Sequence, residues 1–293
     1  MRTVKLSEQL SLSPVVQGFW RLDGWNFSAQ ELAQFMNACI DRGVTSFDTA
    51  EIYAGTLCET LMGEAFEADK TIRSRIQLVS KTGIFQKDGF GYYNTTYDRV
   101  IQSCKESLQR LHTDYLDLYL IHREDPCFDP WETARALKTL KKEGLIREAG
   151  VSNFDPFKFD AINKAMDGTL VTNQIEWNPV CFEHFDSGMM DYLTVNRIHP
   201  MIWSPLAGGR LFKNEDEHCI NAMNKIKEIA DRHGEAPETI IYAWLMYHPA
   251  GAAPISGSNK LERLDLALRA LDVKLEHYEW YEIYTASGTQ VLR

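Results

Sequence analysis

Segments typical of β-strands and segments typical of α-helices alternate along nearly the whole of this 293-residue chain. Short runs rich in β-branched and aromatic residues are each followed by a stretch in which apolar residues recur at helical spacing. Two parallel strands need a long crossover between them, and a helix usually supplies it. The alternation therefore predicts a parallel sheet with helices packed on it. The eight expected strands span residues 15–20, 43–46, 76–80, 115–121, 146–151, 171–175, 201–203 and 253–255.

Eight repeats of strand and helix favour a closed (β/α)8 TIM barrel over an open doubly wound sheet. No linker interrupts the series, so we expect a single domain over residues 1–293. Residues 4–6 and 9–12 alternate loosely around a polar centre and predict an N-terminal β-hairpin ahead of the barrel. The expected helices, which include extra helices beyond the repeats, span residues 28–42 with Ser28 as N-cap, 60–68, 98–111, 130–142, 155–165, 188–195, 220–233, 237–247, 260–271 and 275–286.

The composition is that of a soluble globular protein, with 44% apolar and 25% charged residues and a formal net charge of −10. This negative charge argues against a surface that binds nucleic acid or an anionic membrane. Neither a signal peptide nor an apolar span is visible, so we expect a cytoplasmic protein. The six cysteines lack metal-ligand spacing, and no glycine-rich phosphate loop occurs. We therefore expect no metal site, and any nucleotide must bind without a glycine-rich phosphate loop.

Polar and ionisable side chains stand at the end of nearly every expected strand. In a (β/α)8 barrel the chemistry lies at the C-terminal ends of the strands. Each of these residues alone is compatible with a structural role, such as a turn residue or a buried histidine, but their convergence indicates an active site. In chain order they are Trp20 and Arg21, Asp48 and Tyr53, Lys81, His122, Ser152 and Asn153, Asn173 and Gln174 with Glu176 beyond, Ser204, and Ser256 to Ser258.

Seven segments at these strand ends resemble those of the aldo-keto reductase family, in the same order along the chain. A single segment of this kind is weak support, whereas seven in order are specific. The resemblance extends from Gly18 to Arg263. The segments are FDTAEIY at 47–53, SKTG at 80–83, LIHR at 120–123, GVSNF at 150–154, NQIE at 173–176, WSPL at 203–206 and PISGS at 254–258.

The resemblance implies an NADP-dependent oxidoreductase in which Asp48, Tyr53, Lys81 and His122 form a catalytic tetrad. Reduction of a carbonyl by hydride transfer builds negative charge on the oxygen, so a proton donor and a polarising group are needed. Tyr53 is the expected proton donor. We expect Lys81 to lower the pKa of Tyr53, and Asp48 to keep Lys81 charged and oriented. His122 is expected to hydrogen-bond the carbonyl oxygen and orient the substrate.

The same resemblance implies a cofactor site for NADP(H) in the second half of the chain. Ser152, Asn153 and Gln174 are expected to hold the nicotinamide carboxamide, and Trp203 to stack on the nicotinamide ring. Basic residues would favour the phosphate of NADP over NAD. The chain departs from the family at Asn259, where many members carry a basic residue, and at Leu266 and Ala267, which replace a polar pair often used to grip adenine. The residues expected at the cofactor phosphates are Ser204, Leu206, Gly208, Arg210, Ser256, Gly257, Ser258, Lys260 and Arg263.

The expected substrate is a small carbonyl compound. Residues 85–97 form a long segment rich in Gly and aromatics, and we expect it to be a mobile wall of the pocket that includes Phe85. Trp20 and Trp25 are expected to form the opposite wall. Little chain follows the last helix, which predicts an open mouth and broad acceptance of aldehydes and ketones. We also expect a monomer or weak oligomer.

Two other functions are compatible with the same residues. The scaffold could serve as a regulatory protein that binds a nicotinamide nucleotide with little or no turnover. Alternatively, the barrel could use metal-dependent chemistry or a Schiff base on Lys81, which predicts activity without nicotinamide.

Overall fold

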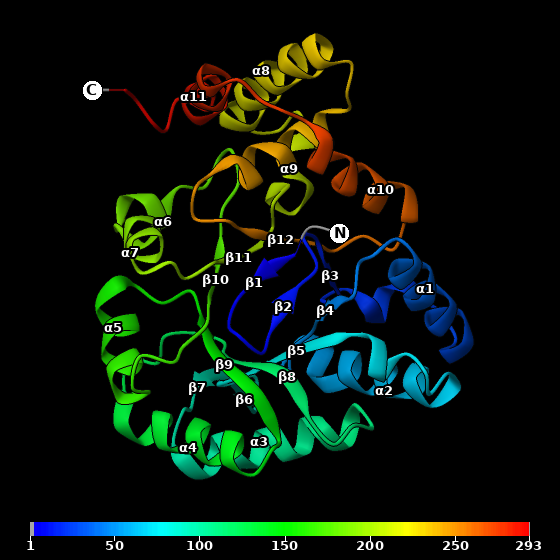
Figure 1. The fold of residues 1–293 in the computed structure, drawn as a ribbon, viewed down its shortest axis with the longest axis vertical. Helices are drawn as coiled ribbons and strands as arrows, with labels where there is room; N and C mark the ends of the chain where they lie inside the picture. Colours follow the sequence, from blue (N-terminus) through cyan, green and yellow to red (C-terminus); the bar gives the residue numbers. More distant parts are fainter. Residues whose placement is uncertain (1–2, 293) are drawn as a thin grey trace.

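Eight parallel strands close into a barrel in the computed structural model, which describes residues 3–292 (Figure 1). The predicted (β/α)8 barrel is thus confirmed. Neighbouring strands follow one another along the chain, and the last strand pairs with the first. In barrel order the strands are β3 (Val16–Gly18), β4 (Ser46–Asp48), β5 (Gln77–Thr82), β8 (Leu116–Ile121), β9 (Ile146–Ser152), β10 (Asn173–Glu176), β11 (Met201–Trp203) and β12 (Ala253–Ser256).

Strand register brings the expected site residues to one end of the barrel. Gly18 of β3 lies opposite Asp48 of β4, and Gln17 lies opposite Ser256 of β12. A Cβ at Gly18 would come within 2.7 Å of a methyl group of Ile255, so the close approach of β3 and β12 requires glycine there. Residues of the first, second and last strands therefore meet at the same C-terminal edge.

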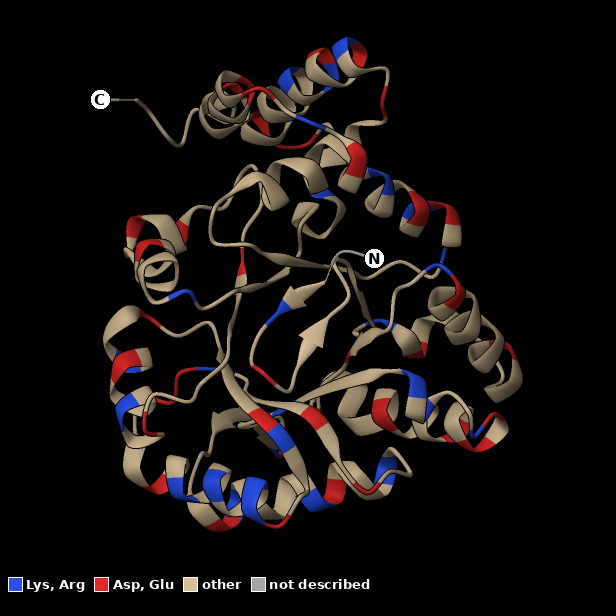
Figure 2. Cartoon of the chain, viewed as in Figure 1, with Lys and Arg blue, Asp and Glu red and all other residues tan. Residues whose placement is uncertain are grey.

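Helices surround the barrel and carry many charged side chains (Figure 2). α1 begins after Ser28, the predicted N-cap, and the structure adds a capping box between the side chains of Ser28 and Glu31. The helices between successive strands are α1 (Ala29–Asp41), α2 (Leu57–Ala68), α3 (Tyr97–Arg110), α4 (Pro130–Lys142), α5 (Pro156–Ala165), α6 (Glu183–Asp186), α7 (Met189–Asn196), α8 (Glu217–His233) and α9 (Pro237–Tyr247), followed after β12 by α10 (Leu261–Arg269) and α11 (His277–Ala286). None of the helices described is long and apolar enough to cross a membrane.

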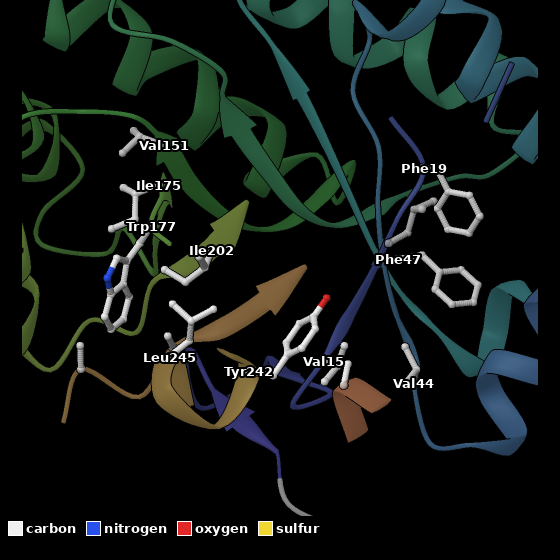
Figure 3. Close-up of a cluster of buried hydrophobic side chains, with 14 of the residues drawn as sticks. Val15, Phe19, Val44, Phe47, Val151, Ile175, Trp177, Ile202, Tyr242 and Leu245 are labelled. Carbon is white, nitrogen blue, oxygen red and sulfur yellow. The ribbon is translucent and has the colours of Figure 1, made fainter. Parts of the chain in front are cut away.

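Two apolar clusters hold the barrel together. The larger lies between strands and helices, and Figure 3 shows part of it, including Ile175 and Ile202 from strands and Leu245 from α9. The smaller lies inside the barrel. The predicted N-terminal hairpin, β1 (Val4–Lys5) and β2 (Ser11–Leu12), contributes Leu10 and Leu12 to this inner cluster. The hairpin thus packs against the barrel interior and leaves the C-terminal edge open for a site.

The segment predicted to be a mobile wall, residues 85–97, overlaps a second hairpin. β6 (Ile84–Lys87) and β7 (Phe90–Tyr93) pair antiparallel around Asp88 and Gly89, whose φ values are 53° and 81°. An Asp-Gly pair with positive φ at both residues makes the tight turn that suits a two-stranded hairpin. This hairpin was not predicted, although the turn pair and the flanking aromatics were visible in the sequence.

The remaining differences from the sequence concern element ends. α2 begins at Leu57 and α8 at Glu217, each three residues before the expected start. Asp216 caps α8 through the backbone N–H of His218. The short α6 was not predicted, since four residues are too few to show a helical period.

Candidate active site

A cavity of about 760 Å3 opens at the C-terminal edge of the barrel. Its volume suits a small organic ligand. Residues at or just after nearly all the barrel strands line it, from Gly18 of β3 to Ser256 of β12. Most of the sequence-predicted site residues therefore meet in one cleft. Those that line it directly are Trp20, Asp48, Tyr53, His122, Ser152, Asn153, Gln174, Trp203, Ser204, Leu206, Gly208, Ser256, Gly257, Ser258 and Arg263.

Lys81 lies beneath the cleft and joins two of its residues. Its side chain is fully buried, and its Nζ donates to Asp48 Oδ1 at 2.7 Å, to the carbonyl of Thr49 at 2.8 Å and to the Tyr53 hydroxyl at 3.2 Å. Burial disfavours the ammonium, but the charge of Asp48 and the oxygen of Tyr53 outweigh this and raise the pKa of Lys81. Lys81 is therefore a fixed cation that points at the Tyr53 oxygen.

Tyr53 stays protonated over a wide pH range. Burial raises the pKa of Tyr53 above its ordinary value of 10.0, and the Lys81 ammonium opposes this rise without cancelling it. Lys81 lowers the pKa of Tyr53, as predicted. The net pKa is nevertheless raised, because the effect of burial is larger, so the expected net lowering was wrong. The phenol faces the cleft as a neutral O–H that can donate a proton.

His122 lies against Tyr53, with 5.7 Å between the ring centroids. Burial, together with the charges of Lys81 and Arg123, holds the pKa of His122 well below 6.5. Its two ring nitrogens hydrogen-bond no other residue between 3 and 292, and Nδ1 is fully buried. A neutral imidazole that lines the cleft with a free nitrogen can donate one hydrogen bond to a ligand oxygen.

Polar side chains on the next strands hold one another in place. Gln174 Nε2 donates to Asp48 Oδ2 at 2.7 Å, which leaves its Oε1 for a ligand. Asn153 Nδ2 donates to Ser152 Oγ at 2.8 Å, and Asn153 Oδ1 accepts from Trp203 Nε1 at 2.8 Å. The indole ring of Trp203 is therefore oriented by Asn153. An amide acceptor and an oriented aromatic ring in one wall match what a nicotinamide carboxamide and ring need.

Two predicted phosphate contacts do not line the cleft. Arg210 is more than half exposed, and its guanidinium lies 3.7 Å from Asp216. Lys260 is exposed before α10, where its backbone N–H donates to Ser258 Oγ at 3.1 Å. Arg263, one turn further along, does reach the cleft. Of the three basic residues predicted at the phosphates, Arg210, Lys260 and Arg263, it is Arg263 that lines the cavity.

The expected substrate walls are only partly present. Trp20 lines the cleft with 55% of its surface exposed. Trp25 packs instead against Phe19 and Phe35, so its prediction as a wall was wrong. Phe85 does not line the cavity, because it turns toward Tyr92 of the hairpin and the guanidinium of Arg99. Ile84, one residue earlier on β6, lines the cavity in its place.

A buried charge network beneath the Tyr53 segment was missed in the sequence. The buried Glu51 carboxylate accepts from Thr82 Oγ1 at 2.8 Å and from Arg99 at 3.0 Å. The backbone N–H of Glu51 donates to the carbonyl of Lys81. Glu51 therefore ties the segment that carries Tyr53 to the strand that carries Lys81. Its place between Asp48 and Tyr53 in the sequence was the available signal.

Glu59 lies in the same network and supports a stability prediction. Its carboxylate is fully buried, where it accepts from Ser80 Oγ at 2.6 Å and from Arg110 at 2.7 Å. We expect Glu59→Ala to lower the free energy of unfolding by about 3 kcal/mol, because it leaves buried donors without a partner. Urea unfolding measures this. Glu106→Ala, which removes a one-third-exposed partner of Arg99, is the control and should cost at most about 1 kcal/mol. Equal losses of unfolding free energy in the two variants would contradict the structural role of the buried Glu59 carboxylate.

Four further lining residues carry charge or a hydroxyl and were not assigned a role from the sequence. They are Arg21, directly after Trp20, Arg123, directly after His122, and Glu238 and Tyr242 of α9. The two residues of α9 gave no sequence signal, since they occur within a helix rather than at a strand end.

The chain is similar to known proteins over nearly its whole length. The model of the aldo/keto reductase family matches residues 14–287. The chain is 39% identical to the uncharacterized oxidoreductase YcsN of Bacillus subtilis, over 98% of both chains. It is 37% identical to a 6-dehydroglucose reductase of Agrobacterium fabrum, over 99% of this chain and 100% of that one. Among solved structures, the thermostable aldo-keto reductase Tm1743, crystallised with the inhibitor epalrestat, is similar with a TM-score of 0.83 and 27% identity, over 98% of this chain and 100% of that one.

Proposed function

This chain belongs to the aldo/keto reductase family, and from that premise we propose that it reduces aldehydes and ketones to alcohols with NADPH as hydride donor. One observation carries the proposal. The Lys81 ammonium joins Asp48 to the Tyr53 hydroxyl, and Tyr53 and His122 face the same cavity. This arrangement supplies a proton donor and a hydrogen-bond donor for a carbonyl oxygen, which carbonyl reduction requires.

Each member of the tetrad has a separate task in this proposal. When bound, the dihydronicotinamide supplies a hydride to the carbonyl carbon. Tyr53 gives its proton to the carbonyl oxygen as negative charge builds there, and the Lys81 ammonium stabilises the phenolate that is left. Asp48 keeps Lys81 charged and oriented toward the Tyr53 hydroxyl. Neutral His122 donates a hydrogen bond to the same oxygen and so fixes the orientation of the substrate.

The residues of the cleft fit a nicotinamide cofactor. Gln174 Oε1 and the Ser152 and Asn153 pair would hold the carboxamide, and Trp203 would stack on the ring. A Cβ built on Gly257 meets no atom within 4 Å, so a phosphate can approach the backbone there. Ser256, Ser258 and Arg263 would hold phosphate groups, and Arg263 supports the preference for NADPH.

The similarity to a 6-dehydroglucose reductase supports a small carbonyl compound as substrate. Trp20 and Ile84 would form its walls, and the half-exposed Trp20 supports an open mouth that accepts several aldehydes and ketones.

A turnover assay tests the proposal. The protein is mixed with NADPH and an excess of 4-nitrobenzaldehyde, and the loss of NADPH absorbance is followed. We expect many turnovers per protein molecule, and a smaller kcat/KM when NADH replaces NADPH. A single turnover or none would favour the regulatory nucleotide-binding alternative. The Schiff-base alternative is disfavoured by Lys81 itself, because a fully buried ammonium with a raised pKa is a poor nucleophile.

The shifted pKa values predict the pH dependence of reduction. The reaction needs Tyr53 protonated, and burial keeps the pKa of Tyr53 above 10.0. It also needs His122 in one protonation state, and the pKa of His122 lies well below 6.5. We therefore expect kcat for reduction to be flat through neutral pH and to fall only above pH 10, as Tyr53 loses its proton. Stopped-flow rates at saturating NADPH measure this, and a loss of rate centred near the ordinary histidine pKa of 6.5 would contradict it.

A further inference from the structure

The cleft is more positive than the protein that surrounds it. Arg21, Arg123 and Arg263 line the cavity, while the acids that line it are Asp48 and Glu238, and Asp48 is paired with Lys81. The whole chain carries a net charge of −10. A positive cleft in a negative protein concentrates anionic ligands at that one place.

Two of these arginines lie where the proposed cofactor phosphates would bind. Arg263 is in the helix that follows Ser256 to Ser258. The guanidinium of Arg21 lies 3.9 Å from where a Cβ of Gly208 would be. The phosphates of one nicotinamide cofactor account for these two charges.

Arg123 is placed differently. It follows His122 directly, and its guanidinium carbon lies 5.6 Å from the centroid of the Trp203 ring. Among residues 3–292, no carboxylate lies within ion-pair distance of its guanidinium, and no side-chain hydrogen bond holds it. Two acids nearby have partners elsewhere: Glu176 Oε1 accepts from Asn178 Nδ2, and Glu124, the next residue in the chain, lies 2.7 Å from Lys158 Nζ. Arg123 is thus a half-buried cation beside the residue that orients the carbonyl, and its contact in the part of the chain that the structure describes is the Trp203 ring rather than a carboxylate.

We propose, on the basis of the reductase function above, that Arg123 selects carbonyl substrates that carry an anionic group near the reacting carbonyl. A partly desolvated guanidinium gains most from an oxyanion that it can hold with two parallel hydrogen bonds. A carboxylate and a phosphate share this chemistry, and short oxo acids bring the carboxylate within reach while His122 holds the carbonyl oxygen. The anionic group is unchanged in the reaction: the carbonyl carbon gains a hydride from NADPH, and its oxygen gains a proton from Tyr53.

Matched substrates test the proposal. The substrates are 4-oxobutanoate, its neutral methyl ester and butanal, with glyceraldehyde 3-phosphate and glyceraldehyde as the phosphate pair. In one of these two sets, we expect kcat/KM to be at least about tenfold higher for the charged compound than for its neutral analogues, mainly through a lower KM. Arg123→Gln should reduce this ratio at least about tenfold, and Arg123→Lys should keep part of it. Which pair shows the preference identifies carboxylate or phosphate as the recognised group.

A binding measurement tests anion recognition by Arg123 independently of turnover. Calorimetry with succinate and with inorganic phosphate is run on the protein saturated with NADP+, for the wild type and for Arg123→Gln. Weaker anion binding in the variant supports the proposal. Equal anion binding in both proteins, or no preference for either charged substrate, overturns it. Failure of the reductase function is distinct, since it would show as no turnover of the neutral aldehydes as well.

Discussion

Replacing Tyr53 by phenylalanine is expected to abolish carbonyl reduction, with a fall in kcat of roughly 10²- to 10⁴-fold. The substitution removes the hydroxyl that lies 3.2 Å from Lys81 Nζ and leaves the ring in contact with Trp20 and His122. The charge that develops on the substrate oxygen then has no proton donor. Steady-state rates with NADPH and 4-nitrobenzaldehyde measure the loss.

Two controls separate chemistry from folding in this variant. NADPH should still quench tryptophan fluorescence, because Trp203 and its partner Asn153 are unchanged. Tyr278→Phe, which removes an exposed hydroxyl on α11, should leave kcat unaltered. Undiminished turnover in Tyr53→Phe would remove Tyr53 as the proton donor.

Lys81→Met is expected to affect both activity and stability. Without the ammonium, the phenolate of Tyr53 is not stabilised, so kcat should fall by roughly 10²-fold or more. The variant also leaves the Asp48 carboxylate buried with Gln174 as its remaining side-chain partner. We expect a loss of about 3–5 kcal/mol in the free energy of unfolding, measured by urea denaturation.

A double variant separates these two effects. Asp48→Asn combined with Lys81→Met removes both charges of the buried pair, so most of the lost stability should return. Activity should not return, because neither the cation nor its orienting acid is present. Recovery of turnover in the double variant would show that Lys81 acts only by neutralising Asp48.

The sequence was sufficient for the barrel and for most of the cleft. Helical spacing and strand composition are local properties, and in a (β/α)8 barrel the order of strands along the chain is their order in space. Asp48, Tyr53 and His122 could therefore be assigned to one cavity, and Lys81 to a place beside them, before any coordinates were known. The resemblance to a family supplied their proposed roles.

Side-chain direction and burial could not be read in the same way. Arg210 belongs to a 3-10 segment (Ala207–Phe212) in which Gly208 and Gly209 have φ values of 64° and 94°, and this local backbone turns its side chain toward Asp216. The pKa of Tyr53 depends on how far the ring is removed from water, which spacing along the chain does not reveal. Phe85 and Ile84 are neighbours on a strand and face opposite ways, so an error of one residue moved the predicted wall out of the cleft.

The most direct test of the proposed reaction follows the hydride itself. The protein is incubated with NADPH that carries deuterium at the transferable position of the nicotinamide and with an excess of an aldehyde, and the alcohol is analysed by mass spectrometry. We expect one deuterium on the carbinol carbon of every product molecule, over many turnovers. An alcohol without deuterium, or no alcohol at all, would contradict it.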